Sequence, residues 1–554
     1  MTPDVLIVGS GSAGSVLAAR LSENPGRRVD LIEAGRDFVP GREPWDVRST
    51  FPYSSFNPRY LWPGLTVHWR RRDNSPRSPF AQARVVGGGS TVMGMWALRG
   101  VPEDYDAWAR GGAAGWGWDD VLPHFKRLET DVDFPGEPHG SDGPVPIRRL
   151  FRPDWSPLAR SVHEDAGRLG FRDVADMNAD FGDGHCVLPM SRTATGRASA
   201  GLCYLTSTVR RRPNLRVEAD TLVERVVIEG GRATGVQVRR PDGQTEIRPA
   251  AQVILACGAI YTPLLLMRSG IGPAAHLTDI GVPVLADRAG VGENLQNHPF
   301  LPILFFLTPR GREAAGRPNA CTYLRWSSGL GGSARGDLGL YVRSYLAWHA
   351  LGRQMGMLSP ILMAPRSRGR VRLSPGRDGA PLVEFDFLSD PADLSRLLTM
   401  MRVALRLLEG SACRNIASEP FVMRNAARLS AMNDLSWQNG LRARLAAALR
   451  DASPSLGGAL LRRLAQLETV ADAPDEELGE IARSTIIGTN HVVGTCRMGR
   501  PDDPLAVTDN TGRVFGAERL RVIDASLMPT LPSANTHVPT VMLAEKLAAR
   551  IAEP

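Results

Sequence analysis

The sequence predicts an α/β protein (α+β overall) with two domains, on three observations. The chain opens with an apolar run, Val5 to Val8, that ends in a glycine cluster, and Val29 to Ile32 repeats the strand pattern. The chain has 554 residues, of which 43% are apolar, and a chain of this length is too long to fold around one compact core. Between residues 301 and 480, alternating stretches mix with long helical ones. We therefore expect a Rossmann-like domain and a second domain that combines an antiparallel sheet with helices.

The first strand leads into a G-x-G-x-x-G motif formed by Gly9, Gly11 and Gly14. Such glycines allow a tight turn, the approach of a pyrophosphate to bare backbone, and close packing of the next helix. Helical spacing follows from Val16 to Leu21, so unpaired helix N-terminal amides would face that phosphate. Glu33 closes the second strand about twenty residues later, where an acid meets a ribose hydroxyl. This pattern predicts a nucleotide site but does not separate FAD from NAD.

A second glycine cluster follows a Pro-, Trp- and Tyr-rich segment, Pro40 to Pro79, which we expect to be an extended excursion. The stretch from Ala83 to Gly100 starts like a strand and breaks into three glycines, Gly87 to Gly89. Close approach of the backbone to a flat ligand explains them, and a flexible loop is the alternative. Further on, Val223 to Gly258 alternates like β structure, and Tyr261 to Gly272 has a helical apolar face.

Composition excludes several classes of protein. The net charge is +8, but only two of the 66 basic residues, Lys126 and Lys546, are lysine, and the basic runs are short, so no nucleic-acid surface is indicated. The six cysteines form no C-x-x-C pair, so neither a metal site nor a disulfide framework is expected. No apolar run approaches the roughly 20 residues of a membrane span. We expect a cytoplasmic enzyme without a membrane span.

Several motifs together resemble the glucose-methanol-choline (GMC) oxidoreductase family over nearly the whole chain. In order, they are the N-terminal glycine motif with IEAG, ARVVGGGSTVMG, RGVPEDYDAW, GAIYTPLLLMRSGIG, VGENLQNHP, HVVGTCRMG and IDASLMPTLPSANTHVPT. GGGSTVMGMWALRG is most similar to bacterial members that oxidise aromatic and furanic primary alcohols. The resemblance implies bound FAD, an alcohol substrate, and oxygen or a quinone-type carrier as electron acceptor.

The resemblance also implies domain bounds and cofactor contacts. Residues 1–145, 196–300 and 480–554 would form a discontinuous FAD-binding domain, and residues 146–195 and 301–479 the substrate-binding domain. The expected FAD contacts are Gly9, Ser10, Gly11, Ser12, Ala13, Gly14, Glu33, Ala34, Arg84, Val86, Gly88, Gly89, Ser90, Met93, Gly94, Met95, Val223, Asp524, Ala525, Asn535 and Thr536.

Three positions depart from the family pattern. Val92 stands where some members carry a histidine bonded covalently to the flavin, so FAD should be non-covalent. Met93 replaces a common asparagine, which alters contacts near the flavin. Asn297 occupies a position that is commonly aspartate, and the sequence gives no consequence for it.

Oxidation of an alcohol by hydride transfer leaves a hydroxyl proton, so the site needs a base, and histidine titrates near neutrality. Of the ten histidines, His491 precedes a glycine turn and His537 opens the final helix; in the family, the matching positions face the flavin. We expect His491 to be the base and His537 its hydrogen-bonding partner, or the reverse. We expect the other histidines to form structural hydrogen bonds and to take no part in catalysis: His68, His124, His139, His163, His185, His276, His298 and His349.

Other interpretations stay open at this point. Trp96 and Asn490 neighbour flavin motifs and are candidates either for the substrate pocket or for packing. The reaction could be that of an alcohol oxidase forming hydrogen peroxide, or of a choline or aliphatic-alcohol dehydrogenase. A hydroxynitrile lyase that retains FAD, and a nucleotide-binding structural protein, are the alternatives from other classes.

Overall fold

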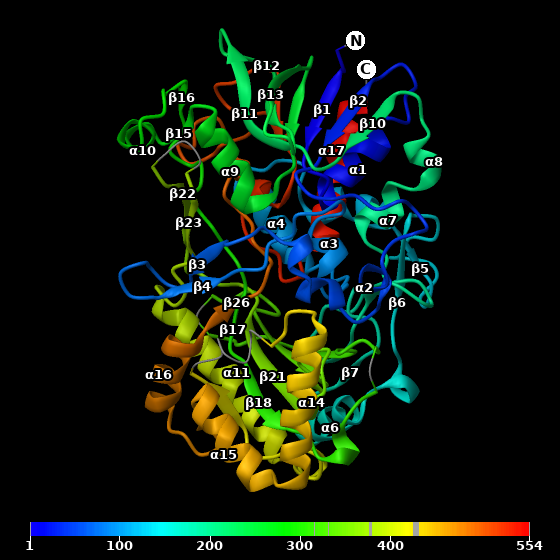
Figure 1. Cartoon of the computed structure of the whole chain (residues 1–554), viewed down its shortest axis with the longest axis vertical. Helices are drawn as coiled ribbons and strands as arrows, with labels where there is room; N and C mark the ends of the chain where they lie inside the picture. The colour runs from blue at the N-terminus through cyan, green and yellow to red at the C-terminus, as the bar shows by residue number, and fades with distance from the viewer. Residues whose placement is uncertain (1, 315, 331, 376–378, 425–431, 553–554) are drawn as a thin grey trace.

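A computed structural model describes residues 2–314, 316–330, 332–375, 379–424 and 432–552. The molecule is elongated, with a parallel sheet at one end and a larger mixed sheet at the other (Figure 1). The parallel sheet has the strand order β10-β2-β1-β14-β27, and neighbouring strands run parallel throughout. These strands are β1 (Val5–Val8), β2 (Val29–Ile32), β10 (Leu215–Glu218), β14 (Val253–Leu255) and β27 (Leu520–Val522).

Alternate side chains of β1 enter different cores, as the two-residue repeat of a strand requires. Val5 and Ile7 pack with α1 (Ser12–Leu21) and α17 (His537–Ala552), whereas Leu6 and Val8 pack toward the three-stranded sheet β11-β12-β13. Burial on both faces explains why the strand is an unbroken apolar run. The three covering strands are β11 (Leu222–Glu229), β12 (Arg232–Arg239) and β13 (Thr245–Pro249).

The larger sheet has ten strands among the described residues, and its order is β25-β24-β18-β21-β20-β19-β8-β7, with β17 and β26 paired beside β21. It is antiparallel except between β7 and β8. Its strands are β7 (Asp173–Val174), β8 (Gly184–Val187), β17 (Pro299–Phe300), β18 (Ile303–Phe306), β19 (Thr322–Trp326), β20 (Leu338–Arg343), β21 (Met355–Leu362), β24 (Phe421–Met423), β25 (Leu467–Thr469) and β26 (Ile487–Gly488).

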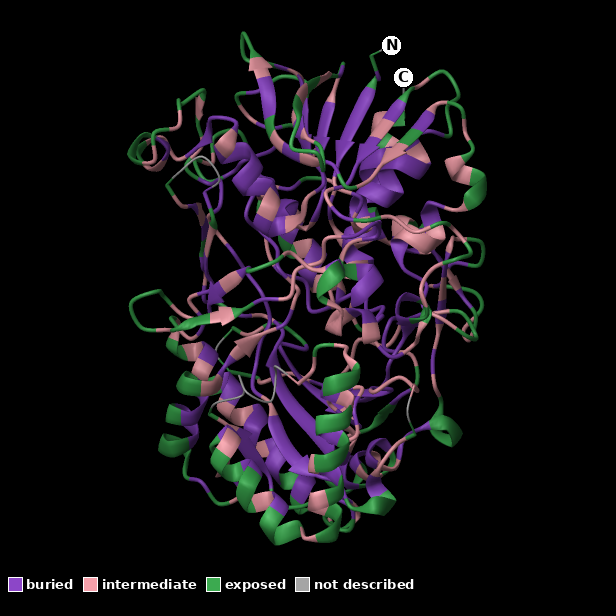
Figure 2. Cartoon of the chain, in the orientation of Figure 1, coloured by how far each residue is buried: buried purple, intermediate pink, exposed green. Residues whose placement is uncertain are grey.

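Helices cover the larger sheet on the outside of the molecule. The long helix α11 (Pro391–Glu409) packs on β20 and β21, and its solvent side is exposed together with α14, α15 and α16 (Figure 2). These helices are α14 (Trp437–Ala452), α15 (Pro454–Ala465) and α16 (Asp475–Thr485), with α6 (Pro157–Arg168) and α12 (Ser411–Arg414) beside them. None of the described helices combines the length and apolarity that crossing a bilayer requires.

Two crossings of the chain between the sheets determine where the site forms. Pro299–Phe300 of β17 pairs antiparallel with Ile487–Gly488 of β26, so two segments distant in sequence run side by side, one where the chain has just left the parallel-sheet half and the other where it is about to return. The crossings lie near residues 300 and 480, the bounds expected from the sequence, although β26 belongs to the larger sheet. The domain bounds stay a prediction.

The Pro40–Pro79 segment contains more regular structure than expected. It forms α2 (Trp45–Arg48), two 3₁₀ turns, β3 (Thr66–His68) and β4 (Arg77–Pro79). The last two complete a four-stranded sheet with β22 (Arg370–Leu373) and β23 (Pro381–Glu384). β3 and β4 pair with each other, and β3 joins the sheet through Glu384 of β23, about 300 residues away. Strands of three residues are too short to show a periodicity of their own.

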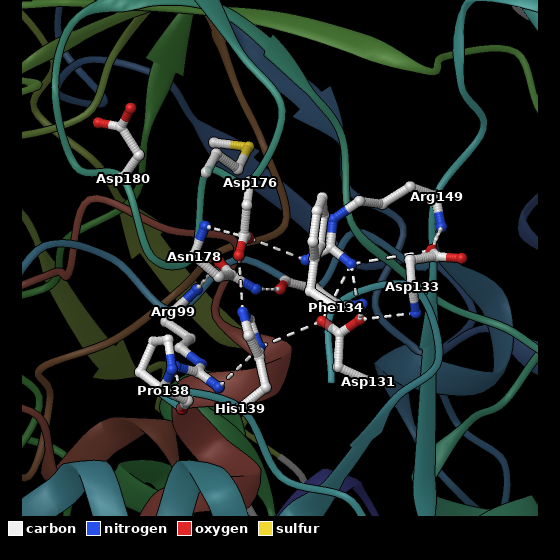
Figure 3. A network of polar contacts seen from close by, with 12 residues as sticks. Arg99, Asp131, Asp133, Phe134, Pro138, His139, Arg149, Asp176, Asn178 and Asp180 are labelled. Carbon is white, nitrogen blue, oxygen red and sulfur yellow. Dashed lines mark hydrogen bonds and ion pairs between the residues drawn. The ribbon is translucent and has the colours of Figure 1, made fainter. Parts of the chain in front are cut away.

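A buried ionic network joins the segment after the second glycine cluster to the larger sheet (Figure 3). Arg99 donates to Glu129 at 2.5 Å, and Arg149 donates to Asp131 at 2.9 Å. His139 lies between Glu129 and Asp176, at 3.0 and 2.7 Å. Burial opposes the charged form of His139, but its hydrogen bonds to Asp176 and Glu129 outweigh burial and raise its pKa to about 9. The network fixes the loops that lead to the site.

Candidate active site

A cavity of about 1550 Å³ extends from the first glycine motif to the ten-stranded sheet. It is lined by most residues that the sequence singled out: Gly9, Gly11, Ser12, Ala13, Glu33, Ala34, Gly88, Gly89, Ser90, Met93, Gly94, Met95, Trp96, Val223, Asn490, His491, Asp524, Ala525, Asn535, Thr536 and His537. The structure therefore brings together segments from both termini and from the middle of the chain.

The glycine clusters form one wall of the cavity. A side chain at Gly11 would meet nothing within 4 Å, so its bare backbone faces open space at the N-terminus of α1. A Cβ at Gly14 would lie 1.8 Å from the carbonyl oxygen of Gly9, which makes Gly14 a packing glycine. Gly88 has a φ of 54°, and a Cβ there would lie 2.7 Å from Cα of Gly11. The two glycine clusters thus touch through their backbones, and Gly88 does not tolerate a side chain at the contact.

Glu33 ends β2 and presents a buried carboxylate at the same wall. The carboxylate accepts hydrogen bonds from the Ser10 amide at 2.9 Å, the Ser10 hydroxyl at 2.7 Å and the Gly35 amide at 2.8 Å. Burial raises its pKa, and these donors act in the opposite direction. Glu33 is therefore held rigidly by the backbone of the glycine motif, in the position expected for a ribose contact.

Four of the expected cofactor residues lie behind the wall instead of lining it, namely Ser10, Gly14, Arg84 and Val86. Ser10 holds Glu33, as described above. Arg84 donates to the carbonyl oxygen of Ala34 at 2.9 Å, and the Val86 amide donates to the carbonyl oxygen of Arg36 at 3.0 Å. These bonds connect the end of β2 to the second glycine cluster, so Arg84 and Val86 support the wall.

Unpaired polar atoms collect on the cavity wall. Among the described residues, buried side-chain atoms without a hydrogen-bond partner include Asn535 Oδ1, His537 Nε2, Tyr341 Oη and Arg343 Nε, all from residues that line the cavity. Buried polar groups in native proteins are normally hydrogen-bonded. Together with the bare glycine backbone and the uncapped N-terminus of α1, these atoms fit a large polar ligand such as FAD.

His491 lies where the β17 and β26 segments leave the larger sheet. Its Nδ1 is 2.9 Å from Nδ1 of His298, and its Nε2 is 2.8 Å from Nδ2 of Asn535. The other ring nitrogen of His298 lies 3.1 Å from the carbonyl oxygen of Met363, which can only accept. His298 therefore carries its proton on Nε2 and accepts at Nδ1 from His491. This leaves Nε2 of His491 unprotonated, beside the Asn535 amide.

Both histidines of this pair are neutral near pH 7. Burial lowers the pKa of His298 to about 3. Burial also places the pKa of His491 well below its usual value, and the neighbouring His298 and the Arg343 cation act in the same direction. His491 thus presents a lone pair at Nε2 throughout the neutral range, which is the form that accepts a proton.

The hydrogen-bonding partner of His491 differs from the expectation. Asn535, not His537, contacts its ring, because Asn535 lies in the loop before α17, whereas His537 is the first residue of that helix. Nδ1 of His537 lies 2.9 Å from the Ser12 hydroxyl at the start of α1. Burial and the Arg197 cation lower the pKa of His537 to about 4. His537 thereby bridges the two helix N-termini at the cavity.

The loops that carry His491 and Asn535 are fixed by buried acceptors. Asn297, the replacement for an aspartate, accepts from the Thr489 hydroxyl at 2.7 Å and the His491 amide at 3.1 Å, and its own amide donates to the Thr489 carbonyl at 2.5 Å. An ionised aspartate at this position could accept these hydrogen bonds but could not donate the third. Asp104, from RGVPEDYDAW, accepts from the Ser533 amide at 2.7 Å and so anchors the loop before Asn535.

Val92 and Met93, the other two departures from the family pattern, and the pocket candidates Trp96 and Asn490 lie in or near the cavity wall. Val92 is fully buried in α3 (Gly89–Val92) among apolar residues and does not line the cavity, whereas Met93 does. The Trp96 ring packs edge-on against Tyr341 at 4.3 Å. The Asn490 amide donates to the carbonyl oxygen of Ala81 at 2.6 Å, so one side of it is used in packing.

Two groups of described residues bring possible metal ligands within 4.8 Å of one another, and neither lines the cavity. Glu129, Asp131 and His139 form the first group, which Arg99 and Arg149 already neutralise. His163, Asp173 and His185 form the second, at the β7–β8 edge of the larger sheet. The six cysteines form no disulfide.

Comparison with models of protein families assigns the chain to a family. The model described as GMC oxidoreductase matches residues 3–300 with its N-terminal part and residues 365–544 with its C-terminal part. The chain belongs to the GMC oxidoreductase family. It is accordingly an FAD-dependent oxidoreductase that acts on CH–OH donors.

Relatives and solved structures agree with this membership. The chain is 38% identical to 5-(hydroxymethyl)furfural oxidase from Methylovorus sp. (strain MP688), with 98% of each chain covered. It is 31% identical to oxygen-dependent choline dehydrogenase from Sinorhizobium medicae (strain WSM419), covering 100% of this chain and 96% of that one. The crystal structure of pyridoxine 4-oxidase from Mesorbium loti superposes with a TM-score of 0.83 at 26% identity, with 99% of each chain covered.

Tyr341 and Arg343, which line the cavity, and His298, which lies behind its wall and contacts His491, are features of the site that the sequence did not single out. His298 directly follows Asn297 in VGENLQNHP, and this adjacency was the available signal. Tyr341 and Arg343 come from β20, a buried strand, and nothing in its sequence indicates that its end reaches the cavity.

Proposed function

We propose that this protein oxidises a primary aromatic or furanic alcohol to the aldehyde and passes the electrons to oxygen, forming hydrogen peroxide. The observation that carries the proposal is the pair formed by His491 Nε2 and Asn535 Nδ2, 2.8 Å apart on the cavity wall. One offers a lone pair and the other an N–H. An alcohol hydroxyl would take the place of this direct hydrogen bond, donating to His491 and accepting from Asn535, which is the arrangement that deprotonation of an alcohol needs.

In this proposal, the chain's own residues hold the alcohol and take its proton. His491 accepts the hydroxyl proton at Nε2, while its Nδ1–H stays bonded to His298. Asn535 stabilises the developing negative charge on the oxygen, an arrangement that is most effective when the donor is already in place. Bound FAD would supply the acceptor for the hydride of the carbinol carbon. The glycine motif, Glu33 and the N-terminus of α17 would hold it along the cavity.

Aromatic side chains beside the pair support a flat substrate. Trp96, Phe300 and Tyr341 line the cavity at its larger-sheet end, and Tyr341 packs against both other rings at centroid distances of 4.3 and 6.5 Å. Such walls favour planar, apolar ligands. The likeness to a 5-(hydroxymethyl)furfural oxidase supports the furanic class and oxygen as acceptor.

The proposal is tested by anaerobic mixing of the purified, FAD-loaded protein with furanic, benzylic and aliphatic alcohols and with choline. Bleaching of the flavin by furanic and benzylic alcohols, followed by peroxide formation when oxygen is admitted, is the expected result. Bleaching by choline alone would instead favour the dehydrogenase related to the choline enzymes. No bleaching by any alcohol, with release of cyanide from a cyanohydrin, would favour the lyase and contradict the proposal.

A further inference from the structure

Arg343 is the last residue of β20 and lines the cavity beside the His491–Asn535 pair. It is half-buried, and its Nε is fully buried without a hydrogen-bond partner. Among the described residues, no carboxylate forms an ion pair with Arg343 and no carbonyl oxygen accepts a hydrogen bond from it. Its guanidinium carbon lies 5.9 Å from the ring centroid of Trp96 and 5.9 Å from that of Tyr341.

Other buried arginines of this chain have at least one hydrogen-bond or ion-pair partner, although Arg99 and Arg197 also keep a buried nitrogen without one. Arg99 pairs with Glu129, and Arg396 pairs with Asp337 and Asp393. Arg197 donates to backbone carbonyls at Ser90 and Met93. Taking a cation out of water without a partner costs several kcal/mol, so an unpaired guanidinium in a cavity wall is a feature that calls for a ligand.

No acid of the cavity wall is free to neutralise Arg343. The described acidic residues that line the cavity are Glu33, Glu224 and Asp524. Glu33 is held by Ser10, Glu224 by Gln237 and Arg239, and Asp524 by Thr262 and Ser526. All three belong to the parallel-sheet half or to the strands that cover it. The end of the cavity that holds the aromatic rings is therefore cationic.

We propose that Arg343 binds a carboxylate group of the substrate, so that the preferred substrates are aromatic or furanic alcohols bearing a carboxylate away from the hydroxymethyl group. This inference rests on the alcohol oxidation proposed above. The planar guanidinium matches a carboxylate through two parallel N–H donors. The rings of Trp96 and Tyr341 would hold the flat body of the substrate, and the hydroxyl would reach His491 and Asn535.

The same geometry couples substrate binding to the base. The Arg343 cation is one of the influences that lower the pKa of His491. A carboxylate seated on Arg343 would cancel much of that field, and the pKa of His491 would rise, which makes it a stronger base when the substrate is present. A trimethylammonium substrate such as choline would instead add a second cation beside Arg343, which is unfavourable.

The test compares 4-(hydroxymethyl)benzoate with its uncharged methyl ester, on the FAD-loaded wild-type protein and on Arg343→Met. Methionine keeps the length of the stem and removes the charge. We expect kcat/KM for the acid to fall about 10- to 100-fold in Arg343→Met, the effect of losing a charge-assisted hydrogen bond, while kcat/KM for the ester stays within about threefold. Arg444→Met, at an exposed position on α14, is the control for net charge and should change neither substrate.

A second readout does not depend on turnover. Benzoate, which has no hydroxymethyl group, should perturb the flavin spectrum of the wild type on binding and bind about 10- to 100-fold more weakly to Arg343→Met. Equal losses for acid and ester in that variant, or unchanged benzoate binding, would overturn the assignment and indicate that Arg343 contacts the cofactor or only packs. If the proposed alcohol oxidation itself were wrong, neither the acid nor the ester would bleach the flavin of the wild-type protein, and this outcome is distinct from the two above.

Discussion

His298 is expected to control catalysis without touching the substrate, through the proton on His491. Replacing His298 by leucine removes the acceptor 2.9 Å from Nδ1 of His491 and leaves that N–H buried without a partner. An unsatisfied buried donor costs about 1–3 kcal/mol, so the tautomer with the proton on Nε2, which cannot act as a base, becomes competitive. The rate of anaerobic flavin reduction should therefore fall about 5- to 150-fold.

The measurement is stopped-flow reduction of FAD-loaded protein by a saturating benzylic alcohol. His298→Asn should recover part of the rate, because its carbonyl oxygen can accept from His491. His185→Leu is the matched control: His185 is equally buried and also bonded to a histidine, but that histidine, His163, does not line the cavity, so loss of His185 should leave the reductive rate unchanged. If His298→Leu keeps its FAD and reduces at nearly the wild-type rate, the tautomer argument is wrong.

Three further predictions concern the cofactor and the ionic network. Acid should release all of the flavin as FAD, since Val92 offers no attachment atom, and flavin left on the denatured chain would contradict this. Glu33→Gln should raise the dissociation constant for FAD while leaving the reductive rate of loaded protein within about threefold, because the carboxylate acts at the ribose end; an unchanged FAD affinity would argue against the ribose contact. His139→Gln should destabilise the protein most in acid. The pKa of His139 is raised to about 9, so the stability that its charged form gives to the fold is fully present below about pH 6.5 and is lost as pH rises through 9. The difference in unfolding free energy from wild type should shrink by up to about 3 kcal/mol between pH 6 and pH 10, and a difference that is constant with pH would refute a charged His139.

The sequence predicted the nucleotide-binding half well because its signals are local. β1, the glycine turn, α1 and β2 follow one another within the first 33 residues, and the strands Val5–Val8 and Val29–Ile32 were expected at the bounds that the structure has. Gly88 and Gly89 were recognisable as wall residues for the same reason, whereas Asp524, Ala525, Asn535 and Thr536 were expected only through the family resemblance. What they touch across the cavity was accessible only through the family resemblance.

The partners of His491 could not be read from the sequence. Its contacts to His298 and Asn535 join segments that are separated by 193 and 44 residues. They depend on the pairing of β17 with β26, two-residue strands that carry no periodicity of their own. The expectation of His537 instead of Asn535 as the partner failed for the same reason: Asn535 lies in the loop before α17 and His537 is the first residue of that helix, and the path of the loop decides which of the two faces His491. Arg343 went unnoticed because an arginine's lack of a partner is a property of the folded state.

The most direct test of the central claim is the rate of anaerobic flavin reduction in His491→Ala, loaded with FAD and compared with Asn535→Ala. If His491 takes the hydroxyl proton, its loss should slow reduction about 10²- to 10⁴-fold, while the wild-type rate stays flat through neutral pH because His491 is already unprotonated there. Asn535→Ala should lose less, since one hydrogen bond to the oxygen is removed and the base remains. Near wild-type reduction by FAD-loaded His491→Ala at neutral pH would contradict the assignment of the base.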